Sequence, residues 1–128
     1  MKNDHRPFNI NLTKIKLPIS ALTSITHRLT GMYVFFITLP LSIFLFYIST
    51  SNAESFLNLI NTLVNNGYIT TFVAFSYLVF LYHILTGVRH LIMDMHIGES
   101  LEASKYSSIF VLFIWVLSVI TSFMVIFT

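Results

Sequence analysis

Three long stretches of the chain carry no charged side chain. Asp, Glu, Lys and Arg are absent from residues 29–53, 55–88 and 106–128. Each stretch exceeds the roughly 20 apolar residues that a helix needs to cross the hydrocarbon core of a bilayer. A helix of a soluble bundle keeps a polar face, and these stretches leave none. The pattern predicts an all-α membrane protein with three transmembrane helices, at about residues 21–49, 68–93 and 105–127, in a single domain over residues 1–128.

Residues between and within the spans predict three further features. Pro40 lies inside the first span and is expected to kink it, because proline removes a backbone hydrogen-bond donor. Residues 55–64 set apolar side chains against Asn and Thr at helical spacing, which predicts a short amphipathic segment on the outer surface. Residues 94–104 are expected to form the loop between the second and third spans.

Positive charge is distributed unevenly along the chain. Of the seven Lys and Arg residues, five precede the first charge-free stretch, and Arg89 and Lys105 flank the second loop. By the positive-inside rule, the N-terminus and the second loop are cytoplasmic and the C-terminus is periplasmic. The polar start and the length of the first apolar stretch predict no cleavable signal peptide, and Asp4 with little Ser is unlike a transit peptide.

Composition narrows the chemistry that the chain can carry. Hydrophobic residues make up 55% and charged residues 9% of the sequence, which fits a membrane protein. Cysteine is absent, so this chain can supply neither a thiolate haem ligand nor a cysteine-ligated Fe–S cluster. Its chemistry must therefore come from polar groups in or beside the spans, which are costly there and mark functional sites.

The first polar group lies at the start of the first span. Ser24, His27, Arg28 and Gly31 fall at positions i, i+3, i+4 and i+7 and so share one helix face. A hydroxyl, an imidazole and a guanidinium on one face can hold a polar headgroup whose tail stays in lipid. The alternative is that Arg28 only extends to lipid phosphates as an ordinary boundary anchor.

The second polar group lies in the second span. His83 is deep in the charge-free stretch, and His90 follows two turns later on the same face. A neutral imidazole at this depth suits the axial ligation of haem iron, and Gly87 would let a flat macrocycle lie against the helix. Arg89 and His90 could neutralise haem propionates, with Asp94 orienting His90. The alternative is that His83 only hydrogen-bonds a neighbouring helix.

A count of histidines predicts a partner. Haem ligation by two histidines of this chain would need a second deep imidazole besides His83. The other histidines lie at or outside the cytoplasmic boundary: His5, His27, His90 and His96. A second axial ligand would therefore have to come from another subunit.

Both polar groups match a known family. The pattern HxxxGVRHLxMD, beginning at His83, resembles the second-helix signature of the cytochrome b (larger membrane-anchor) subunit of succinate dehydrogenase. The pattern SxxHRxTG, beginning at Ser24, resembles its first-helix signature. The lead-in Arg6-Pro7 through Leu17-Pro18-Ile19 is similar to that of the bacterial type, although Phe8 departs from it. The Ser-Pro-His run of mitochondrial relatives is missing, which favours the bacterial cytoplasmic (inner) membrane over the mitochondrial inner membrane.

The resemblance implies a role for each matching residue. His83 takes the position of the axial haem ligand, and a smaller hydrophobic anchor subunit would supply the second ligand. Ser24 and Arg28 take positions that line the ubiquinone site, where they would hydrogen-bond the quinone oxygens. The candidate contacts to the haem propionates are His27, Arg89 and His90.

The resemblance also implies the setting of the chain. It would be a non-catalytic anchor of succinate:ubiquinone oxidoreductase (complex II), in the citric acid cycle and the respiratory chain. It would bind haem b, with ubiquinone as substrate and with an Fe–S subunit, a flavoprotein subunit and the bilayer as partners; no nucleic acid is expected. Two alternatives stay open: the anchor of a related fumarate reductase, and a non-redox structural or transport membrane protein.

Overall fold

The computed structural model describes residues 17–127, and every regular element within them is helical. The elements are α1 (Ile19–Tyr33), η1 (Val34–Thr38), α2 (Leu39–Ser51), α3 (Ala53–Asn65), α4 (Gly67–Asp94) and α5 (Leu101–Phe127). Three helices are long and apolar enough to cross a membrane: Ile19–Ser51, Gly67–Asp94 and Leu101–Ile126. The expected all-α fold with three spans is confirmed.

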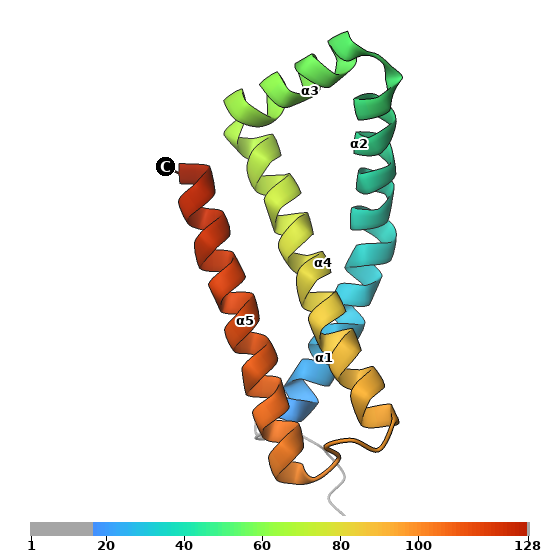
Figure 1. The fold of residues 1–128 in the computed structure, drawn as a ribbon, viewed down its shortest axis with the longest axis vertical. Coiled ribbons are helices and arrows are strands. Elements are labelled where there is room, and N and C mark those ends of the chain that lie inside the picture. The colour runs from blue at the N-terminus through green and yellow to red at the C-terminus, as the bar shows by residue number, and fades with distance from the viewer. Residues whose placement is uncertain (1–16, 128) are drawn as a thin grey trace, which may run out of the picture.

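The three long helices meet at one end and separate toward the other (Figure 1). Helix α1 crosses α4 near the end where α4 finishes and α5 begins, and α5 runs beside α4. Beyond the crossing α2 diverges from α4, and α3 bridges the gap between them. The C-terminal end of α5 lies at the same end of the molecule as α3.

The first span is interrupted where the sequence predicts a kink. Helix α1 passes into the π-helical turn η1, and α2 begins at Leu39 with Pro40 in its first turn. The Leu39 backbone N–H donates to the carbonyl of Val34, five residues back. This bond spans five residues in place of the usual four, so it shifts the backbone hydrogen-bond pattern immediately before Pro40, which has no N–H to donate. Figure 1 shows the resulting change of direction between α1 and α2.

Two boundaries differ from the sequence expectation. Helix α5 begins at Leu101 and not near 105, because Ser100 caps it: its hydroxyl oxygen accepts from Ala103 N–H at 3.2 Å. The second loop is correspondingly shorter than residues 94–104. Helix α3 extends over Ala53–Asn65, because the Asn52 side chain caps it by accepting from Ser55 N–H at 2.8 Å.

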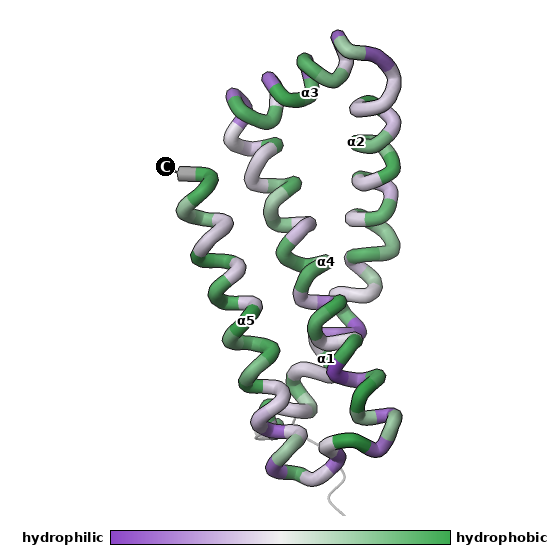
Figure 2. Tube along the Cα trace, viewed as in Figure 1, coloured by the Kyte–Doolittle hydropathy of each residue, from purple (hydrophilic) through white to green (hydrophobic). Residues whose placement is uncertain are grey.

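The helices pack through polar side chains. Among the described residues, the fully buried side chains are Thr23, Ser76, Thr86 and Ser108. Thr23 and Ser108 join α1 to α5 through hydroxyls 3.2 Å apart. Figure 2 shows hydrophobic residues along α2, α4 and α5, and hydrophilic ones at the two ends and where α1 crosses α4. Lipid is as apolar as leucine, so small and polar residues hold membrane helices together.

Candidate functional site

The crossing of α1 and α4 is built from two copies of one short motif. Residues 27–31 read HRLTG, and residues 83–87 read HILTG. Both copies follow the pattern His-x-Leu-Thr-Gly, and they lie on helices that run in opposite directions (Figure 1). Each copy contacts the other, so the contacts made by one motif are repeated by its partner.

The crossing brings three histidines together. The rings of His27 and His83 stack face to face, with centroids 4.2 Å apart and planes within 5°. The ring of His90 lies 5.1 Å from that of His27, tilted by 50°. The two polar groups expected from the sequence, one on each span, therefore form a single site through their histidines.

The two motif glycines allow this close approach. A Cβ atom on Gly31 would meet Cε1 of His83 at 3.0 Å, and one on Gly87 would meet Cε1 of His27 at 3.2 Å. Each imidazole thus lies over the glycine of the opposite helix. The space above Gly87, expected to receive a flat macrocycle, is filled by the ring of His27. In this arrangement Gly87 serves helix–helix contact.

The two motif threonines contact the same imidazoles. Oγ1 of Thr30 lies 3.3 Å from Nδ1 of His83, and Oγ1 of Thr86 lies 2.8 Å from Nδ1 of His27. The main-chain carbonyl oxygen of His27 lies 3.2 Å from Nδ1 of His83. A carbonyl oxygen only accepts, so this bond places the ring proton of His83 on Nδ1 and the lone pair on Nε2.

Nε2 is the unused nitrogen of both stacked rings. Neither His27 nor His83 forms a hydrogen bond through Nε2 with another residue of the 17–127 stretch. No three His, Cys, Asp or Glu side chains in that stretch converge to hold a bare metal ion. The site therefore suits a metal that brings most of its own ligands, as the porphyrin of haem does, since one imidazole then suffices from this chain.

Ser24 and Arg28 lie beside the histidines on α1. Ser24 is half-buried, whereas Arg28 is exposed one turn later. Within the described residues, the Arg28 guanidinium has neither a hydrogen bond nor an ion pair. The sequence expectation that these two residues share a helix face with His27 agrees with their positions on α1.

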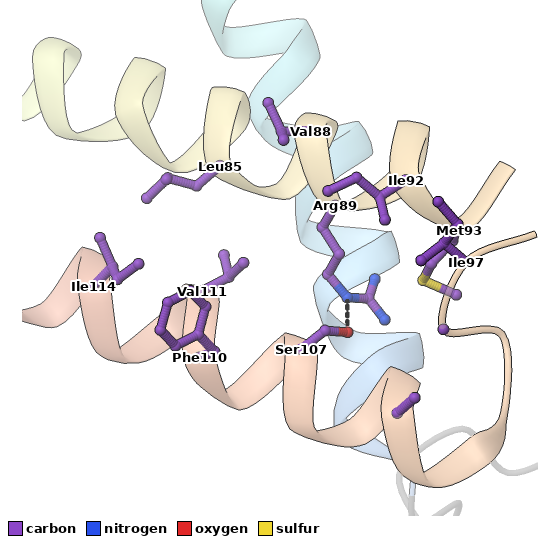
Figure 3. Close-up of a pocket in the computed structure, with 12 residues that line it drawn as sticks. Leu85, Val88, Arg89, Ile92, Met93, Ile97, Ser107, Phe110, Val111 and Ile114 are labelled. Carbon is purple, nitrogen blue, oxygen red and sulfur yellow. Dashed lines mark hydrogen bonds between the residues drawn. The ribbon is translucent and has the colours of Figure 1, made fainter. Parts of the chain in front are cut away.

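Arg89 lies away from the histidines. It is 5% exposed, and its guanidinium points toward α5 (Figure 3). Its Nε donates to Oγ of Ser107 at 3.0 Å, and its Nη2 donates to the carbonyl and hydroxyl oxygens of Ser104 at 3.1 and 2.8 Å. It lines an apolar cavity of about 380 Å³ between α4 and α5. The structure does not bring Arg89 together with His83, and Asp94 is exposed at the end of α4 without a hydrogen bond to His90 in the described part.

Sequence reasoning found the histidines but missed the threonines between them. Thr30 and Thr86 were not among the expected site residues, although both contact an imidazole of the opposite helix. One signal was present in the sequence: the repetition of His-x-Leu-Thr-Gly on two spans. A repeated five-residue pattern with a single intramembrane histidine in each copy indicates a shared contact, which the individual motifs do not.

The fold and the site together define a class of protein: a multi-pass membrane subunit with a histidine site inside its helix bundle. The family of succinate dehydrogenase/fumarate reductase transmembrane subunits matches residues 2–122. A succinate dehydrogenase cytochrome b556 subunit of Coxiella burnetii is 39% identical over 106 residues, covering 83% of this chain and 84% of the relative.

Two further relatives are the succinate dehydrogenase cytochrome b560 subunits of Chondrus crispus and Porphyra purpurea. The first is 36% identical, with 90% of this chain and 89% of the relative aligned. The second is 31% identical, with 80% and 82% aligned. The chain belongs to the family of succinate dehydrogenase cytochrome b anchor subunits. As such an anchor, it partners the membrane and the other subunits of its complex.

Proposed function

We propose that the chain anchors succinate:ubiquinone oxidoreductase (complex II) in the membrane, binds haem b through His83 and contributes to the quinone-reduction site. The observation that carries this proposal is the state of His83, a deep imidazole with Nδ1 hydrogen-bonded and with no partner for Nε2 among residues 17–127. Histidines that ligate metals commonly donate the N–H of their other ring nitrogen to a carbonyl oxygen or a similar acceptor in this way. The relatives are cytochrome b556 and cytochrome b560 subunits, which supports haem b as the group.

The geometry also supports a second anchor subunit. Two histidines that held the same haem would need room for the macrocycle between their rings. His27 and His83 stack flat against each other at 4.2 Å, so they cannot flank a macrocycle as arranged here. A smaller hydrophobic anchor subunit would supply the opposite ligand. When bound, the haem iron would accept and release single electrons within the membrane.

Ser24 and Arg28 are proposed to hold the quinone. The exposed Arg28 guanidinium donates hydrogen bonds and carries the positive charge that stabilises a quinone oxygen as it becomes reduced. Ser24 lies one turn earlier and offers a neutral donor. An apolar quinone tail would remain in the surrounding lipid.

Residues around the histidines are candidates for the haem propionates. His27 and His90 lie together at the crossing, so we assign the propionates to them first. Arg89 remains a weaker candidate, because its Nε and Nη2 are already bonded to α5. Its buried positive charge can still act on a nearby carboxylate without a direct hydrogen bond.

The distribution of charge supports one orientation of the chain in the membrane. The start of α1, the end of α4 and the start of α5 share one end of the molecule, where Arg28, Arg89 and Lys105 lie. By the positive-inside rule this end is cytoplasmic, and the C-terminus is periplasmic. The Fe–S and flavoprotein subunits would dock there. We assign the chain to a bacterial cytoplasmic membrane, with the mitochondrial inner membrane as the alternative.

A related fumarate reductase is the second candidate, because the matching family description covers both enzymes. The three relatives described above are all succinate dehydrogenase subunits, which favours succinate oxidation with quinone reduction. The hydrogen bonds of His83 to α1 also fit the non-redox alternative. The family match favours the redox subunit over it.

The haem assignment is tested by a reduced-minus-oxidised optical spectrum of the purified complex. We expect a haem b signal in the wild type and its loss or displacement in His83→Leu. The matched control is His96→Leu, because His96 is an exposed loop histidine bonded to Glu99 and should leave the signal unchanged. A wild-type complex without haem, or a His83→Leu complex with an unaltered signal, would sink the assignment.

The quinone assignment is tested by steady-state quinone reduction. Losing a hydrogen bond to a charged group costs about 1.5–3 kcal/mol, so Arg28→Leu should lower kcat/KM by roughly 10- to 150-fold. Ser24→Ala should act in the same direction and less strongly. Lys105→Leu is the control, because it removes another exposed cation from the same end of the molecule. If Arg28→Leu and Lys105→Leu behave alike, Arg28 is only a lipid anchor.

A further inference from the structure

The hydroxyl protons of the two motif threonines are already committed to carbonyl oxygens. Oγ1 of Thr30 donates to the carbonyl of His27, 2.9 Å away in its own helix. Oγ1 of Thr86 donates to the carbonyl of Tyr82 at 2.8 Å or that of His83 at 3.1 Å. A hydroxyl has one proton to give and two lone pairs that can accept. Toward the histidines, both threonines therefore act as acceptors.

These hydrogen bonds determine which ring nitrogen of each imidazole carries the proton. His83 donates its Nδ1–H toward Thr30 Oγ1 and the His27 carbonyl oxygen, and His27 donates its Nδ1–H to Thr86 Oγ1. Each neutral ring then carries its lone pair on Nε2. The two motif copies thus produce the same tautomer twice, each through the threonine of the opposite helix.

The acceptors also fix how each ring is rotated. The His83 ring is held between the stacked ring of His27 and two acceptors on α1 that lie 3.2 and 3.3 Å from the same nitrogen. The open backbone of Gly31 lies beneath Cε1. Turning the ring by half a revolution would remove Nδ1–H from both acceptors and direct a carbon at them.

We propose that Thr30 is a positioning residue for the metal-binding imidazole: its hydroxyl oxygen accepts from Nδ1–H of His83, holds the ring in one tautomer and rotation, and presents Nε2 to the iron. This rests on the proposed function, in which His83 is the axial haem ligand. A hydrogen bond from Nδ1–H makes the imidazole a stronger electron donor, which stabilises the oxidised iron. Removing the acceptor should therefore raise the midpoint potential of the haem.

The test compares four variants in the assembled complex by potentiometric titration of the haem spectrum and by the electron paramagnetic resonance signal of the oxidised haem. Thr30→Val replaces the hydroxyl by a methyl group of similar size, and Thr30→Ala removes it without adding atoms. Thr30→Ser keeps the hydroxyl and should rescue. Thr26→Val is the matched control, one turn earlier on α1, because its hydroxyl bonds Tyr82 and no histidine.

We expect a raised midpoint potential and an altered resonance signal in Thr30→Val and Thr30→Ala, with wild-type values in Thr30→Ser and Thr26→Val. Loss of haem from the first two variants alone would support the same conclusion. Wild-type potential and signal in Thr30→Val or Thr30→Ala would overturn the proposal, as would equal effects in all four variants, because packing alone would then explain them. A wild type without haem would instead refute the proposed function.

Discussion

Replacing Gly31 by alanine tests whether the close approach of α1 and α4 positions the His83 ring. The added Cβ would meet Cε1 of His83 at 3.0 Å, whereas ordinary contacts of this kind begin near 3.4 Å. The ring must therefore retreat from α1 by about 0.4 Å. Both acceptors of its Nδ1–H also belong to α1, so the same movement lengthens both hydrogen bonds.

The magnitude follows from these distances. Bonds of 3.2 and 3.3 Å lengthened by about 0.4 Å pass out of the range of useful hydrogen bonds. Overpacking a close contact costs about 1–3 kcal/mol, and alanine returns about 0.8–1 kcal/mol through its higher helix propensity. Weakening the support of a metal-ligating histidine typically lowers metal affinity by about 10- to 100-fold. We expect Gly31→Ala to lower haem occupancy accordingly and to raise the haem potential.

The assay is haem content per assembled complex, measured with the midpoint potential. Gly67→Ala is the control, because a Cβ at Gly67 meets nothing within 4 Å. Wild-type haem content and potential in Gly31→Ala would refute the reasoning, since the helices would then have separated without disturbing the ring. A loss of equal size in Gly67→Ala would trace the effect to the glycine substitution itself.

Two other changes test the polar packing between helices. The hydroxyls of Thr23 and Ser108 bond across α1 and α5 at 3.2 Å. In a double-mutant cycle of unfolding free energy, Thr23→Val and Ser108→Ala should therefore show a coupling of about 0.6 kcal/mol, and at most about 1.7 kcal/mol. Additive effects would mean that this bond contributes nothing. Trp115→Phe should destabilise the complex by a similar amount in thermal unfolding, because Nε1 of Trp115 donates to the carbonyl of Leu78 at 2.9 Å. An unchanged unfolding temperature would contradict it.

The spans were predictable because the bilayer imposes a simple rule. A charge-free stretch of sufficient length has few alternatives to a helix, so all three spans were found within a few residues of their ends. The start of α5 was placed too late because residues 94–104, with Glu102 among them, were taken as the loop. In the structure Ser100 caps the helix, and Glu102 lies in its first turn, where a negative charge is favourable.

The partners of Arg89 could not be taken from its place in the motif. Arg89 lies next to His90 in the sequence and six residues after His83. At about 100° per residue, the side chains of Arg89 and His83 point about 120° apart around the helix. The spacing alone shows that the two side chains leave α4 on different sides. The residues that accept hydrogen bonds from Arg89 depend on where α5 packs. The structure identifies Ser104 and Ser107 of α5 as these acceptors, which the sequence alone does not.

The reciprocal contacts explain why two similar motifs need not have the same function. Antiparallel helices that cross are related by a local two-fold axis, so a motif that fits its own copy makes each contact twice. The symmetry is broken at the second position, where Arg28 follows His27 but Ile84 follows His83. In the proposed function, the apolar neighbour Ile84 suits His83 to hold the iron, and Arg28 next to His27 suits that end of the site for a polar headgroup.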